Sequence, residues 1–538
     1  NNPGMIPSFP HSQQNQQPPS APQQQRQQQY QQQQHHQQQQ PAVPQHRFGR
    51  PIHATYPSAA PAPARGFAPI GTATTTPNGS AVSDMTSSDV TIVSSSTSST
   101  SNSASTSSSS FSMNSSGTAR SLLSQSSDPE VARVGNLIEK SVRYLYNCVQ
   151  PFQNSPIENV LKVLTRLEKW TDEADRLRGE LAAAGGIPAL IGLFVRYANN
   201  PDILVKVCNI ITYMARNMTC LAAITEHDSI RAVLNTMRMH VREARLQARA
   251  CNALNNLAMK EENRIRIAEE GGIVLILRAM ATHGSDPEVQ ANGCNALWNL
   301  AICNSNRALI CKAKGVKVIL RAMSRFLHDS ALFGEGCGAL WNLADHPPTR
   351  STILAEGGIN VILNAMQRHP HELMMHRLCC GALESLLNDN DMGRVALFKR
   401  SSGIPLVLAA MRTNPMDEEL QSACCGILSS LATGDLMNLA VPVPFSTTIA
   451  GHGAIPLILA ALEQHRGSTK VQGRGCSAIC NLSYDPDVKE ALTAQGANES
   501  VHAALIQHAG DTIVFGTALL ALSQLTQEEA GCFFARAA

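Results

Sequence analysis

A nine-residue motif that returns at a fixed interval constrains this chain more than any other feature of its sequence. Gly293-Cys-Asn-Ala-Leu-Trp-Asn-Leu-Ala301 recurs 43 residues later as Gly336-Cys-Gly-Ala-Leu-Trp-Asn-Leu-Ala344, and a weaker copy, Ala250-Cys-Asn-Ala-Leu-Asn-Asn-Leu-Ala258, lies 43 residues earlier. A fixed period of this size indicates stacked supersecondary units. In each copy Ala and Leu recur at helical spacing around an Asn, so one helix face is predicted to be buried while a neighbouring face carries an amide. The pattern predicts a solenoid of helical repeats.

A second landmark, a glycine ahead of an apolar residue, returns with nearly the same period. The steps between successive landmarks are 86, 43, 43, 45, 50 and 43 residues, and because 86 is twice 43, one repeat is hidden at Asp228-Ser-Ile230. Each unit is predicted to be a short charged helix, a bend at the glycine, a middle helix, a polar turn and a long third helix. Glycine suits the bend because it tolerates positive φ. The landmarks are Gly185-Gly-Ile187, Gly271-Gly-Ile273, Gly315-Val316, Gly357-Gly-Ile359, Gly403-Ile404, Gly453-Ala-Ile455 and Gly496-Ala497.

Two segments of different composition precede the repeats. Residues 1–127 are predicted to be a disordered arm, because 18 of the 28 residues from 13 to 40 are Gln and 23 of the 34 residues from 94 to 127 are Ser or Thr. Such a composition buries too little apolar surface to fold. Residues 128–178 show helical apolar spacing without the full motif, so they are predicted to be an N-terminal helical cap. Residues 179–538 are predicted to form the repeats.

One repeat, the seventh, is longer than the others. Its extra residues lie within 433–445 and include Pro442 and Pro444. Because proline excludes regular helix, this segment is predicted to be an exposed inserted loop.

Together these features resemble the armadillo repeat, which β-catenin, the importin-α carriers and the vacuolar armadillo proteins share. The resemblance rests on the glycine bend and on the terminal Ala-Leu-x-Asn-Leu-Ala, and it covers residues 128–538. It implies an all-α fold: a right-handed armadillo-repeat α-solenoid with three helices in each repeat and about eight repeats. The resemblance is specific for fold and leaves the function open, since many functions occur on this fold.

Charge and cysteine usage exclude several classes of function. The net charge is +2, and after residue 127 there are 38 basic and 39 acidic residues, so the basic stripe of a nucleic-acid binder is lacking. The sequence has no apolar run of about 18 residues, so direct membrane insertion is not predicted. Cysteines at one repeat position are predicted to be buried and reduced, which indicates the cytoplasm, with the nucleus as an alternative. They are Cys251, Cys294, Cys337, Cys380, Cys425 and Cys476.

An asparagine at one position of the third helix is the main candidate for binding. In proteins that this chain resembles, the third helices line a concave groove, and this Asn pairs with the backbone of an extended peptide. A carboxamide offers a donor and an acceptor to any peptide unit. The alternative is that these Asn bond loop carbonyls between repeats and only stabilise stacking. The candidate peptide-binding residues are Asn252, Asn256, Asn295, Trp298, Asn299, Trp341, Asn342 and Asn481.

The asparagine ladder is interrupted at both ends. Its position holds Tyr213, Ser385, Ser430 and Ala521 in the first, fifth, sixth and last repeats, so peptide binding is expected to be strongest over residues 245–345. Trp298 and Trp341 directly precede their Asn. Each is either a binding hot spot in the groove or a side chain that packs between repeats. Importin-α carriers instead place Trp four residues before the Asn, where this chain has Asn, Gly or Ser. The sequence therefore disfavours a nuclear-import carrier.

The sequence contains none of the common catalytic motifs. The nucleophile elbow, the phosphate-binding loop and the zinc-protease helix are absent, and His369, His371 and His376 lack a fourth ligand and are predicted to lie in a solvated loop.

The predicted function is therefore a non-catalytic scaffold or adaptor, without cofactor or metal, whose partners are extended peptide segments of other proteins. The alternatives are a nuclear-import-type cargo carrier, the substrate-recruiting part of a larger multidomain enzyme, and a structural role through the surface. The chain begins without Met, and its oligomeric state, further N-terminal modules and a lipid anchor are left open.

Overall fold

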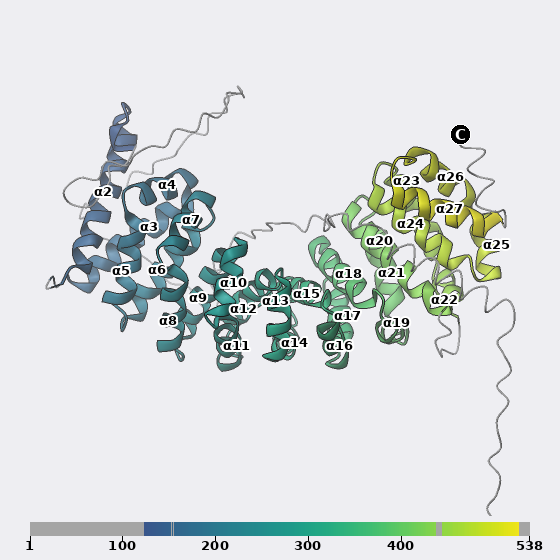
Figure 1. Cartoon of the computed structure of the whole chain (residues 1–538), viewed down its shortest axis with the longest axis horizontal. Coiled ribbons are helices and arrows are strands. Elements are labelled where there is room, and N and C mark those ends of the chain that lie inside the picture. Colours follow the sequence, from purple (N-terminus) through teal and green to yellow (C-terminus); the bar gives the residue numbers. More distant parts are fainter. Residues whose placement is uncertain (1–122, 152, 154, 437–443, 527–538) are drawn as a thin grey trace, which may run out of the picture. The chain divides into compact units, whose positions relative to one another are not determined.

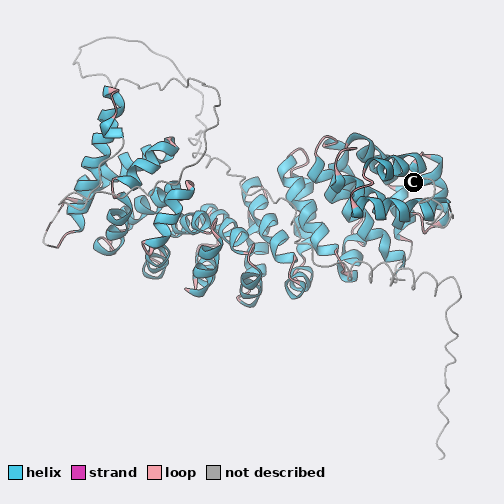
Figure 2. Ribbon diagram, turned by 45° about the horizontal axis from the view of Figure 1, so that its top comes forward, coloured by secondary structure: helices cyan, strands magenta, loops and turns pink. Residues whose placement is uncertain are grey.

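The fold is a stack of helical repeats that follow one another in chain order (Figure 1). The computed structural model describes residues 123–151, 153, 155–436 and 444–526. In these ranges there are 26 α-helices, α2 to α27, one 3-10 helix, η1 (Leu123–Gln125), and no strand (Figure 2). The prediction of an all-α armadillo-repeat solenoid is confirmed. The predicted disordered state of residues 1–122 lies outside the described residues.

Eight repeats of three helices follow two N-terminal helices, α2 (Pro129–Val149) and α3 (Ile157–Glu173). The first helices are α4 (Asp175–Ala183), α7 (Met218–Glu226), α10 (Glu261–Glu269), α13 (Asn304–Lys312), α16 (Pro347–Ala355), α19 (Asp391–Phe398), α22 (Phe445–Gly451) and α25 (Pro486–Ala494). The second helices are α5 (Gly186–Arg196), α8 (Ser229–Met239), α11 (Gly272–Thr282), α14 (Gly315–Arg325), α17 (Gly358–Arg368), α20 (Gly403–Thr413), α23 (Ala454–Gln464) and α26 (Ala497–Gln507). The third helices are α6 (Pro201–Met214), α9 (Ala244–Leu257), α12 (Pro287–Leu300), α15 (Ser330–Ala344), α18 (Leu373–Leu387), α21 (Glu418–Leu436), α24 (Thr469–Leu482) and α27 (Thr512–Thr526).

The two N-terminal boundaries differ from those predicted. Leu123 is only 2% exposed, and η1 lies so close to α2 that a Cβ on Gly135 would be 2.2 Å from the Ser124 backbone nitrogen. The last five residues of the predicted arm, 123–127, therefore belong to the described structure. The boundary between cap and repeats, placed at residue 178, falls inside α4, which begins at Asp175.

The bend between first and second helices uses two adjacent positions for two different reasons. The residue before the second helix adopts the left-handed backbone conformation. Gly271 has φ 81°, and in the hidden repeat the equivalent residue is Asp228, with φ 57°. The next residue is already helical, and at Gly272 a Cβ would lie 2.5 Å from Ile267 Cγ2. The first glycine permits the backbone conformation, and the second permits close approach of the two helices.

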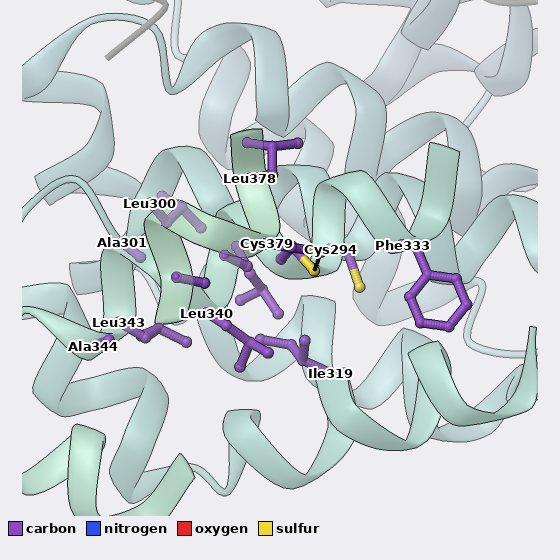
Figure 3. Packing of buried hydrophobic residues seen from close by; sticks show 14 of the residues in the cluster. Cys294, Leu300, Ala301, Ile319, Phe333, Leu340, Leu343, Ala344, Leu378 and Cys379 are labelled. Atoms are coloured by element: carbon purple, nitrogen blue, oxygen red, sulfur yellow. Dashed lines mark hydrogen bonds between the residues drawn. The ribbon is translucent and has the colours of Figure 1, made fainter. Parts of the chain in front are cut away.

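The core runs through the stack between the third helices and their neighbours, and each third helix packs against the one before and the one after it. Cys294, Phe333, Leu340 and Cys379 are among its buried side chains (Figure 3). The six cysteines at the shared repeat position are all buried and unpaired, as predicted. Burial raises the pKa of Cys251 to about 12, so this thiol stays protonated and serves as a small apolar side chain.

The predicted loop over residues 433–445 is shorter than expected. Residues 433–436 continue α21, and Phe445 begins α22 as a fully buried side chain whose ring centroid lies 4.1 Å from that of Phe398. The Asp435 carboxylate accepts the backbone N–H groups of Phe445 at 2.7 Å and Ser446 at 2.8 Å. An acidic side chain thus stabilises the start of α22. Residues 437–443 lie outside the described residues.

Within the described ranges, no single helix has the length and apolar composition that would let it span a membrane, although the bent pairs α4–α5 and α22–α23 each meet that criterion together.

Candidate functional site

The candidate residues lie on the third helices, whose exposed surface we call the third-helix face. They divide into two groups by burial. Asn256, Asn342 and Asn481 are only 7%, 1% and 8% exposed. The half-buried group comprises Asn252, Asn295, Trp298, Asn299 and Trp341. The second group retains surface that a partner can touch, whereas the first is enclosed by the stack.

The ladder asparagines reach back to the preceding third helix. Asn342 Nδ2 donates to the Trp298 carbonyl at 2.9 Å, and Asn299 Nδ2 donates to the Asn255 carbonyl at 3.3 Å and to its side-chain Oδ1 at 2.7 Å. Asn481 Nδ2 donates in the same way to the Ser429 carbonyl at 3.1 Å and to Oγ at 3.0 Å. These bonds join repeats, and their acceptors lie on helices and not on loops.

The end of each third helix explains why an amide is needed there. Carbonyls in the last turn of a helix lack intrahelical partners. In α12 the following backbone N–H groups, those of Ala301 and Ile302, bond to the carbonyls of Leu297 and Asn299 and pass over that of Trp298. The Asn342 amide supplies the missing donor. A buried carbonyl without a partner would be costly, so the side chain stabilises the interface between the third and fourth repeats.

Asn256, the first member of the ladder, has a different partner. Its Nδ2 donates to the Asn252 carbonyl at 3.0 Å and to Asn252 Oδ1 at 3.2 Å, both within α9. The pair Asn252 and Asn256 is therefore an i, i+4 contact along one helix. Asn295 Nδ2 lies 3.4 Å from Glu335 Oε1 on the next third helix.

Each tryptophan lies against a glycine of the following third helix. A Cβ on Gly338 would be 2.5 Å from the Trp298 ring, and a Cβ on Gly381 would be 2.8 Å from the Trp341 ring. These glycines occupy the position four residues before the ladder residue. The absence of a side chain there makes room for the ring, so the tryptophans pack between repeats and still expose part of their surface.

The same register is polar in the C-terminal repeats. Glu384 takes the place of tryptophan, and its Oε1 lies where a Cβ on Gly426 would fall, at 2.3 Å. Across this glycine Glu384 bonds to Arg474 of α24 at 2.7 Å, spanning three successive third helices. Burial raises the pKa of the Glu384 carboxyl to about 7, because the loss of water outweighs the attraction of Arg474. One repeat further on, Ser429 and Ser477 hydroxyls bond at 2.9 Å.

A glutamine that sequence reasoning missed closes the turn before the third helix. Gln290 Nε2 donates to the Met280 carbonyl at 2.8 Å and to the His283 carbonyl at 3.0 Å, and Gln472 donates to Leu462 and His465 in the same way. The signal was available in the sequence, since the glutamines recur nine residues before the ladder position. They are Gln247, Gln290, Gln421 and Gln472.

The histidines that end the second helices form another contact between repeats. His283 Nε2 lies 2.8 Å from the Val241 carbonyl, and His508 Nε2 lies 2.7 Å from the Arg466 carbonyl. Since a carbonyl only accepts, Nε2 carries the proton. The prediction of a solvated loop is wrong for His376, which is 3% exposed inside α18 with its Nδ1 3.3 Å from Asn414 Nδ2. Across the residues with described positions, no group of three or more His, Cys, Asp or Glu is arranged to hold a metal ion.

Three helices per repeat, the glycine bend and the ladder of third helices define an armadillo-type α-solenoid. Comparison with known families agrees: the profile described as LRRK2 ARM repeat matches residues 202–532. The chain belongs to this armadillo-repeat family.

A solved structure extends the likeness in fold. An engineered protein solved as a Northeast Structural Genomics Consortium target superposes with a TM-score of 0.59 at 20% identity, over 75% of this chain and 97% of that one. A second engineered protein from the same consortium gives a TM-score of 0.41 at 20% identity, over 47% of this chain and 96% of that one. The first of these likenesses, at 20% identity, shows the fold alone. No curated protein matches the sequence.

Proposed function

We propose that this protein is a non-catalytic scaffold or adaptor that holds an extended peptide segment of a partner protein along its third-helix face. The observation that carries the proposal is the series of half-buried polar and aromatic side chains on consecutive third helices. Asn252, Asn295 and Asn299 present amides, and Trp298 and Trp341 present ring surface. Amides accept and donate to a peptide backbone of any sequence, and aromatic side chains are favoured anchors at interfaces.

The proposal separates binding residues from stacking residues. Asn256, Asn342 and Asn481 are enclosed by the stack, so we assign them to stacking. Asn299 also donates to the preceding repeat, but it is half-buried and keeps surface that a partner can contact. The five half-buried residues then form the peptide-binding set. This set spans residues 252–341, inside the range where the sequence places the strongest binding.

A nuclear-import carrier remains the less favoured alternative. The positions that would need tryptophan to hold lysine side chains include Gly338 and Gly381, and the rings of the preceding repeat already cover both. We further propose a reducing compartment, the cytoplasm with the nucleus as an alternative, since the 14 cysteines with described positions are all unpaired.

Binding of displayed peptides to the purified full chain tests the proposal. Wild type is compared with Asn252→Ala/Asn295→Ala/Asn299→Ala, and the matched control is Asn235→Ala/Asn364→Ala, whose exposed amides lie on the second helices α8 and α17. We expect the triple variant to lose peptides that both wild type and control retain, while circular dichroism and thermal unfolding show that all three are folded. Equal binding by all three proteins would overturn the proposal.

A further inference from the structure

The second helix of the fourth repeat, α14, carries a row of exposed cations. Lys317, Arg321 and Arg325 follow one another at four-residue steps, so they lie on one face of the helix, and all three side chains are exposed. We call these three residues the α14 basic row. The segment from residue 289 to residue 328 contains no Asp or Glu, although basic and acidic residues nearly balance over the repeats as a whole.

The chain supplies no counterion to the α14 basic row. Among the residues with described positions, none of the three cations makes an ion pair or a side-chain hydrogen bond. On the corresponding helix of the second repeat, α8, Arg231 forms ion pairs with Asp228 at 3.9 Å and with Glu270 at 3.6 Å. Arg238 of the same helix donates to the Glu270 carbonyl at 2.6 Å. The cations of α8 thus hold repeats together, whereas those of α14 do not.

The α14 basic row is also unfavourable for its own helix. Like charges four residues apart on a helix repel one another. Lys317 lies in the first turn of α14, and Lys314 directly precedes the helix in the left-handed conformation, with φ 61°. Both lysines therefore lie near the positive end of the helix dipole, where cations are disfavoured. Anions of a partner would relieve both kinds of repulsion.

The surroundings of α14 limit the positive surface to a narrow strip. The helix packs between α11 and α17 (Figure 1), which add one exposed cation each at the register of the row, Arg278 and Arg368. The first helices of the two flanking repeats, α10 and α16, carry exposed Glu269 and Glu356 at or beside the register of Lys312. A bilayer surface or a nucleic-acid duplex would bring its own negative charge against these carboxylates.

The length of the row suits a short stretch of extended chain. From Lys317 to Arg325 the helix rises by about 12 Å, at 1.5 Å for each residue. An extended peptide covers this length with about four residues. Two or three carboxylates in such a stretch are enough to face the three cations.

We propose that the α14 basic row is a second interaction surface, which binds a short acidic segment, rich in Asp or Glu, of a partner protein. The segment lies along α14, and its carboxylates pair with Lys317, Arg321 and Arg325. This inference goes beyond the proposed function, because the surface is built on second helices and requires none of the peptide-binding residues of the third-helix face.

A random twelve-residue displayed peptide library, selected on the purified full chain, supplies the probe. We expect one class of selected peptides to contain several Asp or Glu residues and to bind Lys317→Gln/Arg321→Gln/Arg325→Gln about tenfold more weakly than wild type. Three exposed ion pairs of ordinary strength together give about this factor. Raising the salt concentration should weaken the binding of the same peptides to wild type, because salt screens exposed charges.

The matched control removes three charges from cations that the chain already uses. It is Arg231→Gln/Arg238→Gln/Arg245→Gln, in which Arg245 pairs with Asp202 at 3.7 Å in the wild type. The control has the same net charge as the α14 variant and should bind the acidic peptides as wild type does. Circular dichroism and thermal unfolding show that both variants are folded.

Three results would overturn the inference. The first is a selection that yields no acidic peptides. The second is an equal loss of acidic peptides from the α14 variant and the control, since net charge alone would then explain binding. The third is binding of the full chain to vesicles of phosphatidylserine and phosphatidylcholine that depends on the α14 basic row, without selection of acidic peptides. Peptides that depend on Asn252, Asn295 and Asn299 test the proposed function separately, and they should bind the α14 variant normally.

Discussion

The third to fifth repeats and the fifth to seventh repeats solve the same packing problem with different chemistry. In the former, the rings of Trp298 and Trp341 fill the space above Gly338 and Gly381. In the latter, the carboxylate of Glu384 lies above Gly426 and pairs with Arg474. Glycine is the shared element. The backbone register fixes where successive repeats touch, and the side chain placed there decides whether this contact between repeats, which we call the joint, is apolar or ionic.

The largest expected effect comes from giving both joints the same methyl group. Gly338→Ala places a Cβ against the rigid Trp298 ring and is expected to lower the free energy of unfolding by about 3 kcal/mol. Gly426→Ala meets only the end of the flexible Glu384 side chain, so we expect about 1 kcal/mol or less. Urea unfolding of the two variants measures the difference, and equal losses would contradict the distinction between the two joints.

The next effect concerns the amide that completes the helix end. Asn342→Ala leaves the Trp298 carbonyl buried without its donor and is expected to cost about 2 kcal/mol. Ser430 and Glu384 hold the register positions that match Asn342 and Trp298, and the Glu384 carbonyl already accepts the Asn388 backbone N–H at 3.0 Å. Ser430→Ala is therefore the control and should change stability by less than about 0.5 kcal/mol. Comparable losses of stability in thermal unfolding of the two variants would show that the hydrogen bond from the Asn342 side chain does not stabilise the interface.

The smallest effect is a pH dependence confined to the ionic joint. Because the folded-state pKa of Glu384, about 7, lies above the usual value of 4.5, the protonated carboxyl stabilises the fold below about pH 4.5, and this contribution is lost as the pH rises through 7. Glu384→Gln should therefore gain about 1 kcal/mol relative to wild type between pH 5 and pH 8. Chemical unfolding at both pH values measures this gain. A difference between the two proteins that is the same at pH 5 and pH 8 would rule it out.

Local spacing predicted the fold because each repeat carries its own signals. The glycine landmarks, including the one hidden at Asp228, mark the bends, and the shared cysteine position marks the core. The boundaries of the elements were less predictable. Leu123 was expected in the disordered arm and Phe445 in the exposed loop, but tertiary contacts bury both. These contacts come from α2 and from Phe398, and the neighbouring sequence does not predict them.

The candidate site was predictable as a position but not as a set of contacts. The ladder register was correct, yet whether an Asn is enclosed or half-buried depends on the repeats that flank it. The Trp298–Gly338 contact joins residues 40 apart, whereas the Asn342–Trp298 bond joins residues 44 apart. A period of 43 residues aligns equivalent positions and so hides contacts between non-equivalent ones.

Those two unequal offsets give the joint a mechanical property. On α15, Gly338 and Asn342 lie one helical turn apart, and Trp298 engages both, with its ring on the first and its carbonyl on the second. Sliding α12 along α15 would therefore displace both contacts together. The two contacts together resist shear between the third and fourth repeats, because no slide of one helix along the other keeps both.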